Sequence, residues 1–272
     1  MYFASTSAEC TQGYIIGLKI SRAATPAHKQ PTIAMSQLLP DLPPPIPFDG
    51  FSTNTFNFLH QLKENNNKPW FDAHRAEYEH HLRQPCKDLV AQMSLLFAEH
   101  GLPLIADQRR SLFRINRDIR FSKDKSPYKT HIGIVFPMDG LGAGEWFGCY
   151  FSFQPEGVRG VLSYCGGGVH MPSAPVLQRL RKRIESNHEE LTALSNDPDF
   201  LAVYPTGLKG ESLRRMPKGY TEPHPAANYL KMTSFEFAAT ITQQQLTSHQ
   251  LPQLLLSHCT AAMPLLEFFA TQ

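Results

Sequence analysis

The densest group of chemically active side chains is the stretch RINRDIRFSKDKSPYK, residues 114–129. It carries three arginines and three lysines around the pair Arg117 and Asp118. A guanidinium donates two parallel hydrogen bonds to a phosphate or a carboxylate, so this group suits the binding of an anion. The same residues are also typical of a strand edge on which Arg and Asp side chains pair with one another. Both interpretations are open on the residues alone.

The positive charge is local. The 272 residues carry a formal net charge of only +2, with 42% hydrophobic and 18% charged residues. Between Asp107 and His131, eight basic side chains stand against three acids, so the remainder of the chain is slightly acidic. A nucleic acid or an anionic membrane would therefore have to be recognised by this cluster, because the chain as a whole has too little charge.

Residues 113–121 are predicted to form a strand, in which alternate side chains share a face. One face would carry Phe113, Ile115, Ile119 and Phe121, and the other would carry Arg114, Asn116, Asp118 and Arg120. Arg117 falls on the apolar face, where it requires a carboxylate, an anionic ligand or a bulge that redirects it.

The distance between these arginines limits whether they can bind the same anion. In a straight strand Arg114 and Arg120 lie about 20 Å apart, at roughly 3.3 Å per residue, and cannot hold one small anion. A common site requires the chain to bend near residues 116–118. The candidate ligand-binding side chains of this stretch are Arg114, Arg117, Arg120, Lys125, Tyr128 and Lys129, with Asp118 orienting a guanidinium or carrying a proton.

Two further segments could complete an anion site. SYCGGGVHMPSAPVLQRL, residues 163–180, is predicted to run from a strand through a turn at Gly166, Gly167 and Gly168 into a helix, whose free N–H groups could hold a phosphate. A plain structural turn is the alternative.

The second segment, residues 208–237, is long, irregular and basic, which favours a functional loop. Its candidate ligand-binding residues are Lys209, Arg215 and Lys218. His224 could transfer a proton or could anchor the loop by hydrogen bonds.

Metal and cofactor chemistry has no support in the motifs. The sequence holds no HExxH, no Cys/His cluster at ligand spacing, no GxSxG and no phosphate-binding P-loop. We therefore predict neither a metal nor a cofactor. A Ser-His-Asp or Cys-His arrangement of distant residues stays open, and so does the question of whether the protein is an enzyme.

The cysteine pattern and the hydropathy of the chain indicate in which cellular compartment the protein is expected. Five cysteines are scattered without a CxxC pair, which predicts reduced thiols. No run of about 18 apolar residues would span a bilayer, and the N-terminus lacks a secretory signal pattern. We expect a soluble cytoplasmic protein without a membrane partner.

The chain is expected to comprise two parts. Residues 1–47 form a Pro-rich, disordered lead-in, with Met35 as a possible true start, and residues 48–272 form one domain. Apolar periodicity predicts helices near residues 51–67, 69–101 (kinked or interrupted at Pro85), 174–194 and 251–270, and strands near 111–121, 130–137, 146–154, 158–165 and 234–242. This order predicts an α+β fold, a single domain with an antiparallel sheet packed against flanking helices.

Several of these blocks, in this order, resemble a bacterial family of unknown function, domain-of-unknown-function family 2461. The best-marked block is R-x-x-R-D-x-R-F followed by an acidic-Lys pair and a Tyr, here Arg114, Arg117, Asp118, Arg120, Phe121, Asp124, Lys125 and Tyr128. The resemblance runs from Phe48 to the C-terminus. It implies membership but no activity, although a family marked by charged residues favours a site. An aspartate usually precedes the family's His-Pro pair, whereas this chain has Pro223 there.

Three functions remain. The first is binding of a phosphorylated or other anionic small molecule through the basic stretch. The second is a nucleic-acid-binding module that uses Phe113, Phe121 and Tyr128 as stacking platforms. The third is a structural or interaction protein whose charges only stabilise the sheet. The oligomeric state stays open.

Overall fold

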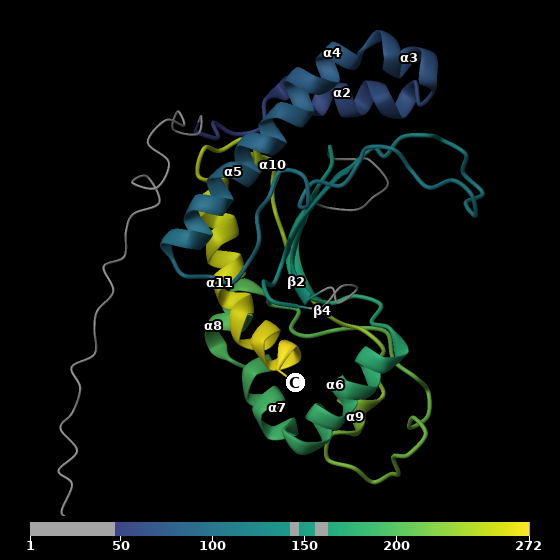
Figure 1. Ribbon diagram of the computed structural model, residues 1–272, viewed down its shortest axis with the longest axis vertical. Helices are drawn as coiled ribbons and strands as arrows, with labels where there is room; N and C mark the ends of the chain where they lie inside the picture. The colour runs from purple at the N-terminus through teal and green to yellow at the C-terminus, as the bar shows by residue number, and fades with distance from the viewer. Residues whose placement is uncertain (1–46, 142–146, 156–162, 272) are drawn as a thin grey trace, which may run out of the picture. The chain divides into compact units, whose positions relative to one another are not determined.

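The computed structural model describes residues 47–141, 147–155 and 163–271. The predicted lead-in up to residue 46, with Met35, lies outside the described residues. Four strands form one open antiparallel sheet in the order β1-β2-β3-β4. They are β1 (Ile132–Pro137), β2 (Phe147–Phe153), β3 (Tyr164–Val169) and β4 (Phe235–Thr240). With helices packed on the sheet, this arrangement confirms the predicted α+β fold (Figure 1).

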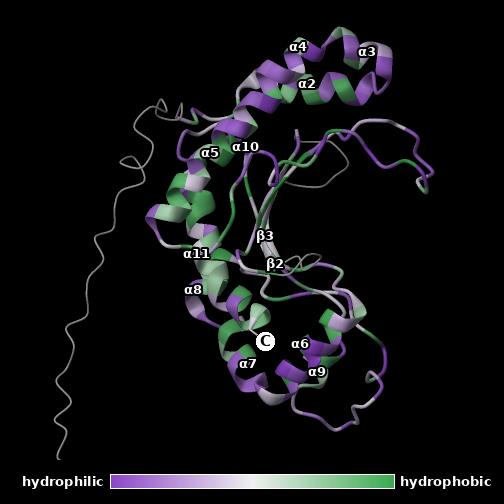
Figure 2. Cartoon of the chain, viewed as in Figure 1, coloured by the Kyte–Doolittle hydropathy of each residue, from purple (hydrophilic) through white to green (hydrophobic). Residues whose placement is uncertain are grey.

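One face of the sheet is sealed by a long helix. Alternation places Phe136, Phe151, Cys165 and Phe235 on the same face, and all four are fully buried. Helix α11 (Leu251–Ala270) packs on that face beside α5 (Gln84–Glu99). Figure 2 shows α11 apolar along most of its length, as expected of a helix covered on several sides. The prediction of a closing helix over residues 251–270 is confirmed.

Shorter helices extend the fold at both ends of the sheet (Figure 1). At one end the chain forms α2 (Thr53–Glu64), α3 (Lys68–Ala73), α4 (Arg75–Glu77) and the π-helical turn η1 (Tyr78–Arg83), which leads into α5. The other helices are α6 (Ala174–Ser186), α7 (His188–Ser195), α8 (Pro198–Val203), α9 (Ala227–Leu230) and α10 (Gln243–Leu246). The single helix predicted over residues 174–194 is therefore wrong, because the chain breaks at Asn187.

The kink or interruption predicted at Pro85 appears only as a change of helix type, because η1 passes directly into α5 at Gln84 and the backbone angles stay helical. Pro85 has no N–H to donate to the carbonyl of His81, four residues earlier. The buried hydroxyl of Thr55 donates to that carbonyl instead, at 2.6 Å. The side chain from α2 thus satisfies an acceptor that the proline leaves open, and it ties α2 to the η1 turn.

The strand predicted over residues 111–121 is wrong. Only isolated bridges form, from Leu112 to Ile134 and from Asn116 to Tyr128. The chain follows the edge of β1 as far as Phe113, whose N–H donates to Gly133. It then leaves the sheet and pairs with residues 127–129 of its own return path. The apolar face expected for a strand is divided accordingly, with Ile115 buried and Phe121 95% exposed.

The glycine turn predicted at residues 166–168 is also wrong. All three glycines lie inside β3, and Gly168 pairs with Gly148 on one side and Glu236 on the other. The strand predicted over residues 158–165 falls partly outside the described residues, and β3 begins at Tyr164. Glycine is needed at position 168 because φ is +120° and a Cβ would lie 1.9 Å from the carbonyl oxygen of Phe235.

We expect Gly168→Ala to lower the free energy of unfolding by more than about 2 kcal/mol, because backbone strain adds to a clash with the neighbouring strand. Gly140→Ala is the matched control. Its φ is also positive (+77°), but no atom lies within 4 Å of its added Cβ. Urea denaturation of both variants tests this account, and equal losses would contradict it.

Candidate functional site

Arg117 is a structural residue of its own loop. Its guanidinium pairs with Asp124 and also donates to the Ser126 carbonyl and the Ser122 hydroxyl. Only 17% of the side chain is exposed, which leaves little of the fork for a ligand. The sequence left a carboxylate, an anionic ligand or a bulge as ways to accommodate Arg117, and the structure shows a carboxylate from the same loop.

The other charged residues of the same loop are also engaged. Arg120 makes a two-pronged pair with Asp118, with a closest approach of 2.6 Å. Lys125 donates to the carbonyl of Ile119. Arg120 holds the pKa of the Asp118 carboxyl below its ordinary value, so Asp118 is ionised and already paired at neutral pH. The bend required of the chain is present, but the arginines have separate partners and do not converge.

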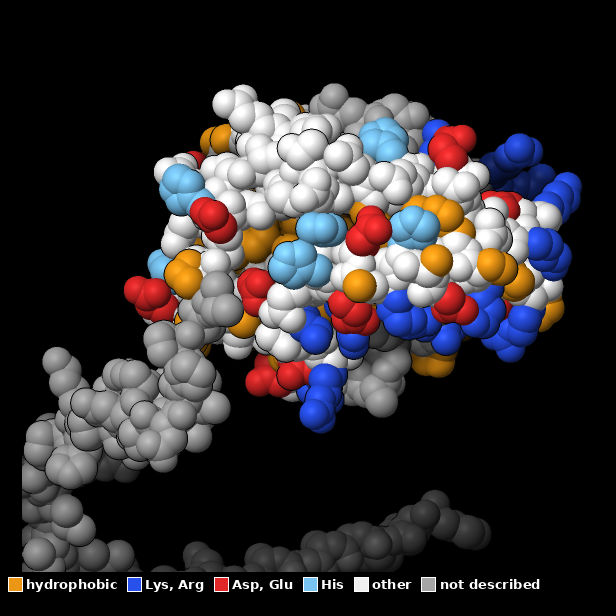
Figure 3. Space-filling model, turned by 90° about the horizontal axis from the view of Figure 1, so that it is seen from above, with side chains coloured by type: hydrophobic (Ala, Val, Ile, Leu, Met, Phe, Trp, Pro, Cys, Tyr) orange, Lys and Arg blue, Asp and Glu red, His pale blue; other side chains and the backbone are white. Residues whose placement is uncertain are grey.

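Arg114 faces a different space, a cleft of about 580 Å³ between the helical segment η1–α5 and the edge of β1. Five basic residues line this basic cleft, namely Arg75, Arg83, Lys87, Arg109 and Arg114, against one acid, Glu79. Lysine and arginine side chains crowd the right of the view in Figure 3, the side on which Figure 1 draws the loop between α5 and β1.

The five cations of the basic cleft differ in how they are paired. Arg83 pairs with Glu79 through two contacts of 2.9 and 3.0 Å, and Arg75 pairs with Asp72 at 2.9 Å. The side chains that have no hydrogen bond or ion pair among the described residues are Lys87, Arg109 and Arg114. The cleft therefore holds positive charge that the protein itself does not neutralise.

Separate local structures hold these three cations. Lys87 lies on α5, and its carbonyl accepts a hydrogen bond from Gln108 at 3.2 Å, which ties the helix to the turn that carries Arg109. Asp107 caps that turn by accepting from the N–H groups of Arg109 and Arg110. The backbone of Arg114 is held by Lys129, whose ammonium donates to its carbonyl at 3.0 Å.

The floor of the basic cleft is apolar. The buried residues that line it are Phe71, Leu82, Cys86, Ile115, Tyr128 and Ile132. Tyr128 is 6% exposed and stacks on Phe71 with ring centroids 4.1 Å apart, so its predicted role as a nucleic-acid stacking platform is wrong. Burial raises the pKa of the neighbouring Tyr78 to about 12 and also raises the pKa of the Cys86 thiol. Both groups are neutral at physiological pH and add no negative charge to the cleft.

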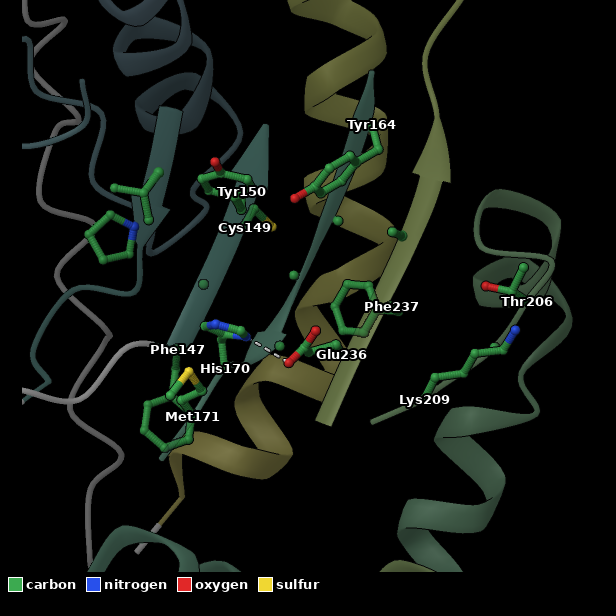
Figure 4. Close-up of a pocket in the computed structure, with 18 of the residues that line it drawn as sticks. Phe147, Cys149, Tyr150, Tyr164, His170, Met171, Thr206, Lys209, Glu236 and Phe237 are labelled. Atoms are coloured by element: carbon green, nitrogen blue, oxygen red, sulfur yellow. Dashed lines mark hydrogen bonds and ion pairs between the residues drawn. The ribbon is translucent and has the colours of Figure 1, made fainter. Parts of the chain in front are cut away.

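The predicted glycines and Lys209 meet at a second cavity, of about 780 Å³, on the face of the sheet that α11 does not cover. We call it the glycine pocket. Figure 4 shows Tyr150 and Tyr164 at one end and His170 with Glu236 at the other. Phe113 lines both cavities. Neither cavity is lined by Arg117, Arg120, Lys125, Lys129, Arg215 or Lys218.

His224 lies in the irregular segment between α8 and β4. Its Nδ1 accepts a hydrogen bond from the N–H of Ala226 at 3.0 Å, just before α9. It lines neither cavity, and neither does Asp118. The two candidate proton carriers are thus apart from the two spaces that could hold a ligand.

Three buried cysteines lie close together in the core. Cys149, Cys165 and Cys259 meet between the sheet and α11, where mutual hydrogen bonds and burial raise the pKa of Cys259. Cys259 therefore stays protonated and is a poor nucleophile. Within the described ranges, no group of three or more His, Cys, Asp or Glu residues is placed to hold a metal ion. No described helix is both long and apolar enough to cross a membrane.

Sequence reasoning missed most of the lining of both cavities. For the basic cleft a signal existed, because Glu79, Arg83 and Lys87 are spaced four residues apart and so share one helical face. For the glycine pocket the available signal was the alternation of side chains along the strands. Tyr150 and Glu236 are polar residues within apolar strands, so they are expected on the sheet face away from the core.

The fold and its cavities define an α+β domain with two candidate ligand sites on one sheet. A family model described as "Conserved hypothetical protein (DUF2461)" matches residues 54–268. The chain therefore belongs to this family, and the predicted membership is confirmed. Comparison with curated proteins and with solved structures gives no match.

We expect Asp124→Asn to lower the melting temperature at neutral pH, because Arg117 then loses its carboxylate. Hydrogen bonds from Ser126, followed by Arg117, hold the pKa of Asp124 well below its ordinary value. A depressed folded-state pKa contributes stability above the unfolded value of about 4, and this contribution is lost as the pH falls further. Melting curves at pH 7 and at stepwise lower pH should show the difference from the wild type shrinking, and a pH-independent difference would contradict this role.

Proposed function

We propose that the protein binds a small anionic molecule, such as a phosphorylated compound, in the basic cleft. The observation that carries this proposal is the charge distribution around the cleft. Glu79, the one acid that lines it, is paired with Arg83, whereas the side chains of Lys87, Arg109 and Arg114 make no hydrogen bond or ion pair among the described residues. Arg114 interacts electrostatically with Asp118, but that carboxylate is itself paired with Arg120. Cations gathered at a cavity without counter-charges raise the local concentration of anions and favour their binding.

The lining of the cleft supports a ligand with two parts. Arg109 and Arg114 offer planar forks that match phosphate or carboxylate oxygens, and Lys87 adds a compact charge. Below them lie the buried rings of Phe71 and Tyr128. A charge-assisted hydrogen bond next to apolar residues is less screened by water than one at an open surface. An anionic group attached to a less polar body suits this lining best.

The nucleic-acid alternative has less support. Of its three proposed stacking residues, Tyr128 is buried, although Phe121 is 95% exposed and Phe113 is 44% exposed. Most of the basic loop is neutralised internally through Asp118 and Asp124. A strand of phosphates needs a row of available cations, whereas the available cations here surround one cavity.

The proposal is for binding and does not extend to a reaction. A general acid or base must lie within hydrogen-bond reach of the proton that it transfers. Neither His224 nor Asp118 lines the basic cleft. We place the binding in the cytosol, since Cys86, Cys149, Cys165 and Cys259 are free thiols, which suits a reducing compartment.

We expect the full-length protein to bind pyrophosphate or ribose 5-phosphate in isothermal titration calorimetry, and Arg114→Gln to weaken that binding by at least ~10-fold, the loss of one charge-assisted hydrogen bond. The variant should fold normally, because the Arg114 side chain is exposed and makes no hydrogen bond or ion pair among the described residues.

Arg120→Gln is the matched control. It removes the same charge from the same basic stretch, but from a side chain that is paired with Asp118 and lies outside the cleft. Binding by this variant should stay within about 2-fold of the wild type at 150 mM salt, where distant surface charges are largely screened. Equal losses in both variants, or no binding by the wild type, would contradict the proposal. Tight binding of oligonucleotides with a steep salt dependence would instead favour the nucleic-acid module.

A further inference from the structure

We propose that the glycine pocket is a second ligand site, which takes a planar heteroaromatic ring with hydrogen-bonding groups along one edge. The pocket lies over the sheet face opposite α11 and holds about 780 Å³, enough for a ring system of nucleoside size. The inference rests on three features of this pocket, namely its floor, its walls and its charged groups, and it does not depend on the basic cleft.

The floor is a strip of bare backbone. Gly148, Gly166 and Gly168 lie on the same sheet face, and the register places Gly148 beside Gly168 and Tyr150 beside Gly166. Ala238 continues the row next to Gly166 on β4. Backbone N–H and C=O groups in this part of the sheet are used by the strand ladders, so the floor offers flat van der Waals contact and few hydrogen bonds.

Aromatic and apolar side chains form the walls. The rings of Tyr150 and Tyr164 lie 5.8 Å apart between centroids, and Phe113 lies 6.1 Å from Tyr150. Burial raises the pKa of Tyr164 to about 12, so its phenol is neutral at physiological pH. Among the described residues few large apolar side chains are exposed, and two of them, Phe113 (44%) and Met171 (79%), border this pocket. Exposed apolar groups gathered around one cavity mark a binding site.

The charged groups lie away from the tyrosine rings: Figure 4 shows His170 and Glu236 together, and Lys209 on the far side of β4. His170 Nδ1 lies 2.8 Å from the Glu236 carboxylate, which keeps its second oxygen for a donor. The N–H of Lys209 donates to the carbonyl of Glu236 at 2.7 Å, and the N–H of Glu236 donates to the carbonyl of Lys209 at 2.6 Å. In such an antiparallel pair the two side chains project to the same side of the sheet. Lys209 has no side-chain partner among the described residues. The pocket can therefore accept hydrogen bonds through Glu236 and donate them through Lys209.

These features together select the ligand class. A sugar carries hydroxyl groups all around its ring, and the glycine floor and the apolar walls would leave most of them unpaired at a cost of about 1–3 kcal/mol each. A planar heteroaromatic ring presents two apolar faces and one polar edge. It can lie flat on the glycine strip beside the tyrosines while its edge meets Glu236 and Lys209.

The direct test is titration calorimetry of the full-length protein with adenosine, guanosine and cytidine, which lack phosphate and so do not probe the basic cleft. We expect at least one nucleoside to bind with a Kd below about 1 mM, the range of a small ligand held by stacking and two or three hydrogen bonds. Glu236→Gln should weaken that binding by ~10-fold, since it removes the charged acceptor.

Ala238→Phe serves as the blocking variant. Ala238 is exposed on the floor of the pocket, so a large ring at this position fills the cavity without entering the core. It should abolish nucleoside binding while pyrophosphate binding and the melting temperature stay unchanged. Phe121→Ala, which removes an exposed ring outside the pocket, should bind like the wild type.

The two sites can fail separately. No binding of any nucleoside, or binding that Ala238→Phe leaves intact, would overturn the second site whatever pyrophosphate does. Equally tight binding of glucose would overturn the assignment to a planar ring.

Discussion

Burial of one face of the four-stranded sheet beneath α11 is the interaction on which the rest of the structure depends. Apolar side chains from β2, β3 and β4 meet that helix, Phe136 of β1 meets Phe97 of α5, and the cysteines of β2, β3 and α11 fill the space between sheet and helix. Because side chains alternate along each strand, sealing one face leaves the other free to carry polar and aromatic groups. The glycine pocket lies on this uncovered face, and the basic cleft lies at its β1 edge.

Pairing of charge separates residues that hold the fold from residues that are available to a ligand. Arg117 and Arg120 belong to the first kind, because Asp124 and Asp118 lie within the same loop and neutralise them. Arg114 belongs to the second kind, because the chain leaves the β1 edge at that point and turns its side chain toward η1 and α5. In this chain both kinds of arginine stand within residues 114–120, so one short stretch of charged residues can combine a scaffold with a candidate site.

The fold was predictable from the sequence to the extent that local periodicity determined it. The strands at residues 132–137 and 235–240 and the helix at 251–270 followed from alternation and apolar content. The strand predicted around Arg117 failed, because period-two alternation cannot reveal that residues 115–117 pair with 127–129 of their own loop. The glycines were assigned to a turn, whereas the close approach of the neighbouring strand explains their position in β3: a Cβ would lie 2.2 Å from the Phe237 carbonyl oxygen at Gly166 and 1.9 Å from that of Phe235 at Gly168.

The candidate sites could be predicted only in part, because contacts between residues distant in sequence decide which cations are available to a ligand. The basic stretch was correctly singled out as dense in charge, but which of its arginines is available depends on carboxylates that only the folded loop brings close, such as Asp124 to Arg117. Lys87 lies 27 residues before Arg114, and a hydrogen bond from Gln108 to its carbonyl helps to bring the two elements to one cavity. No local pattern encodes that contact.

A crystal structure of the full-length protein with pyrophosphate bound would show which cations hold the anion. We expect the pyrophosphate in the basic cleft, within hydrogen-bond distance of the side chains of Arg114 and at least one of Lys87 and Arg109. Pyrophosphate bound instead at Arg117 or Arg120, with their pairs to Asp124 and Asp118 broken, would contradict this expectation.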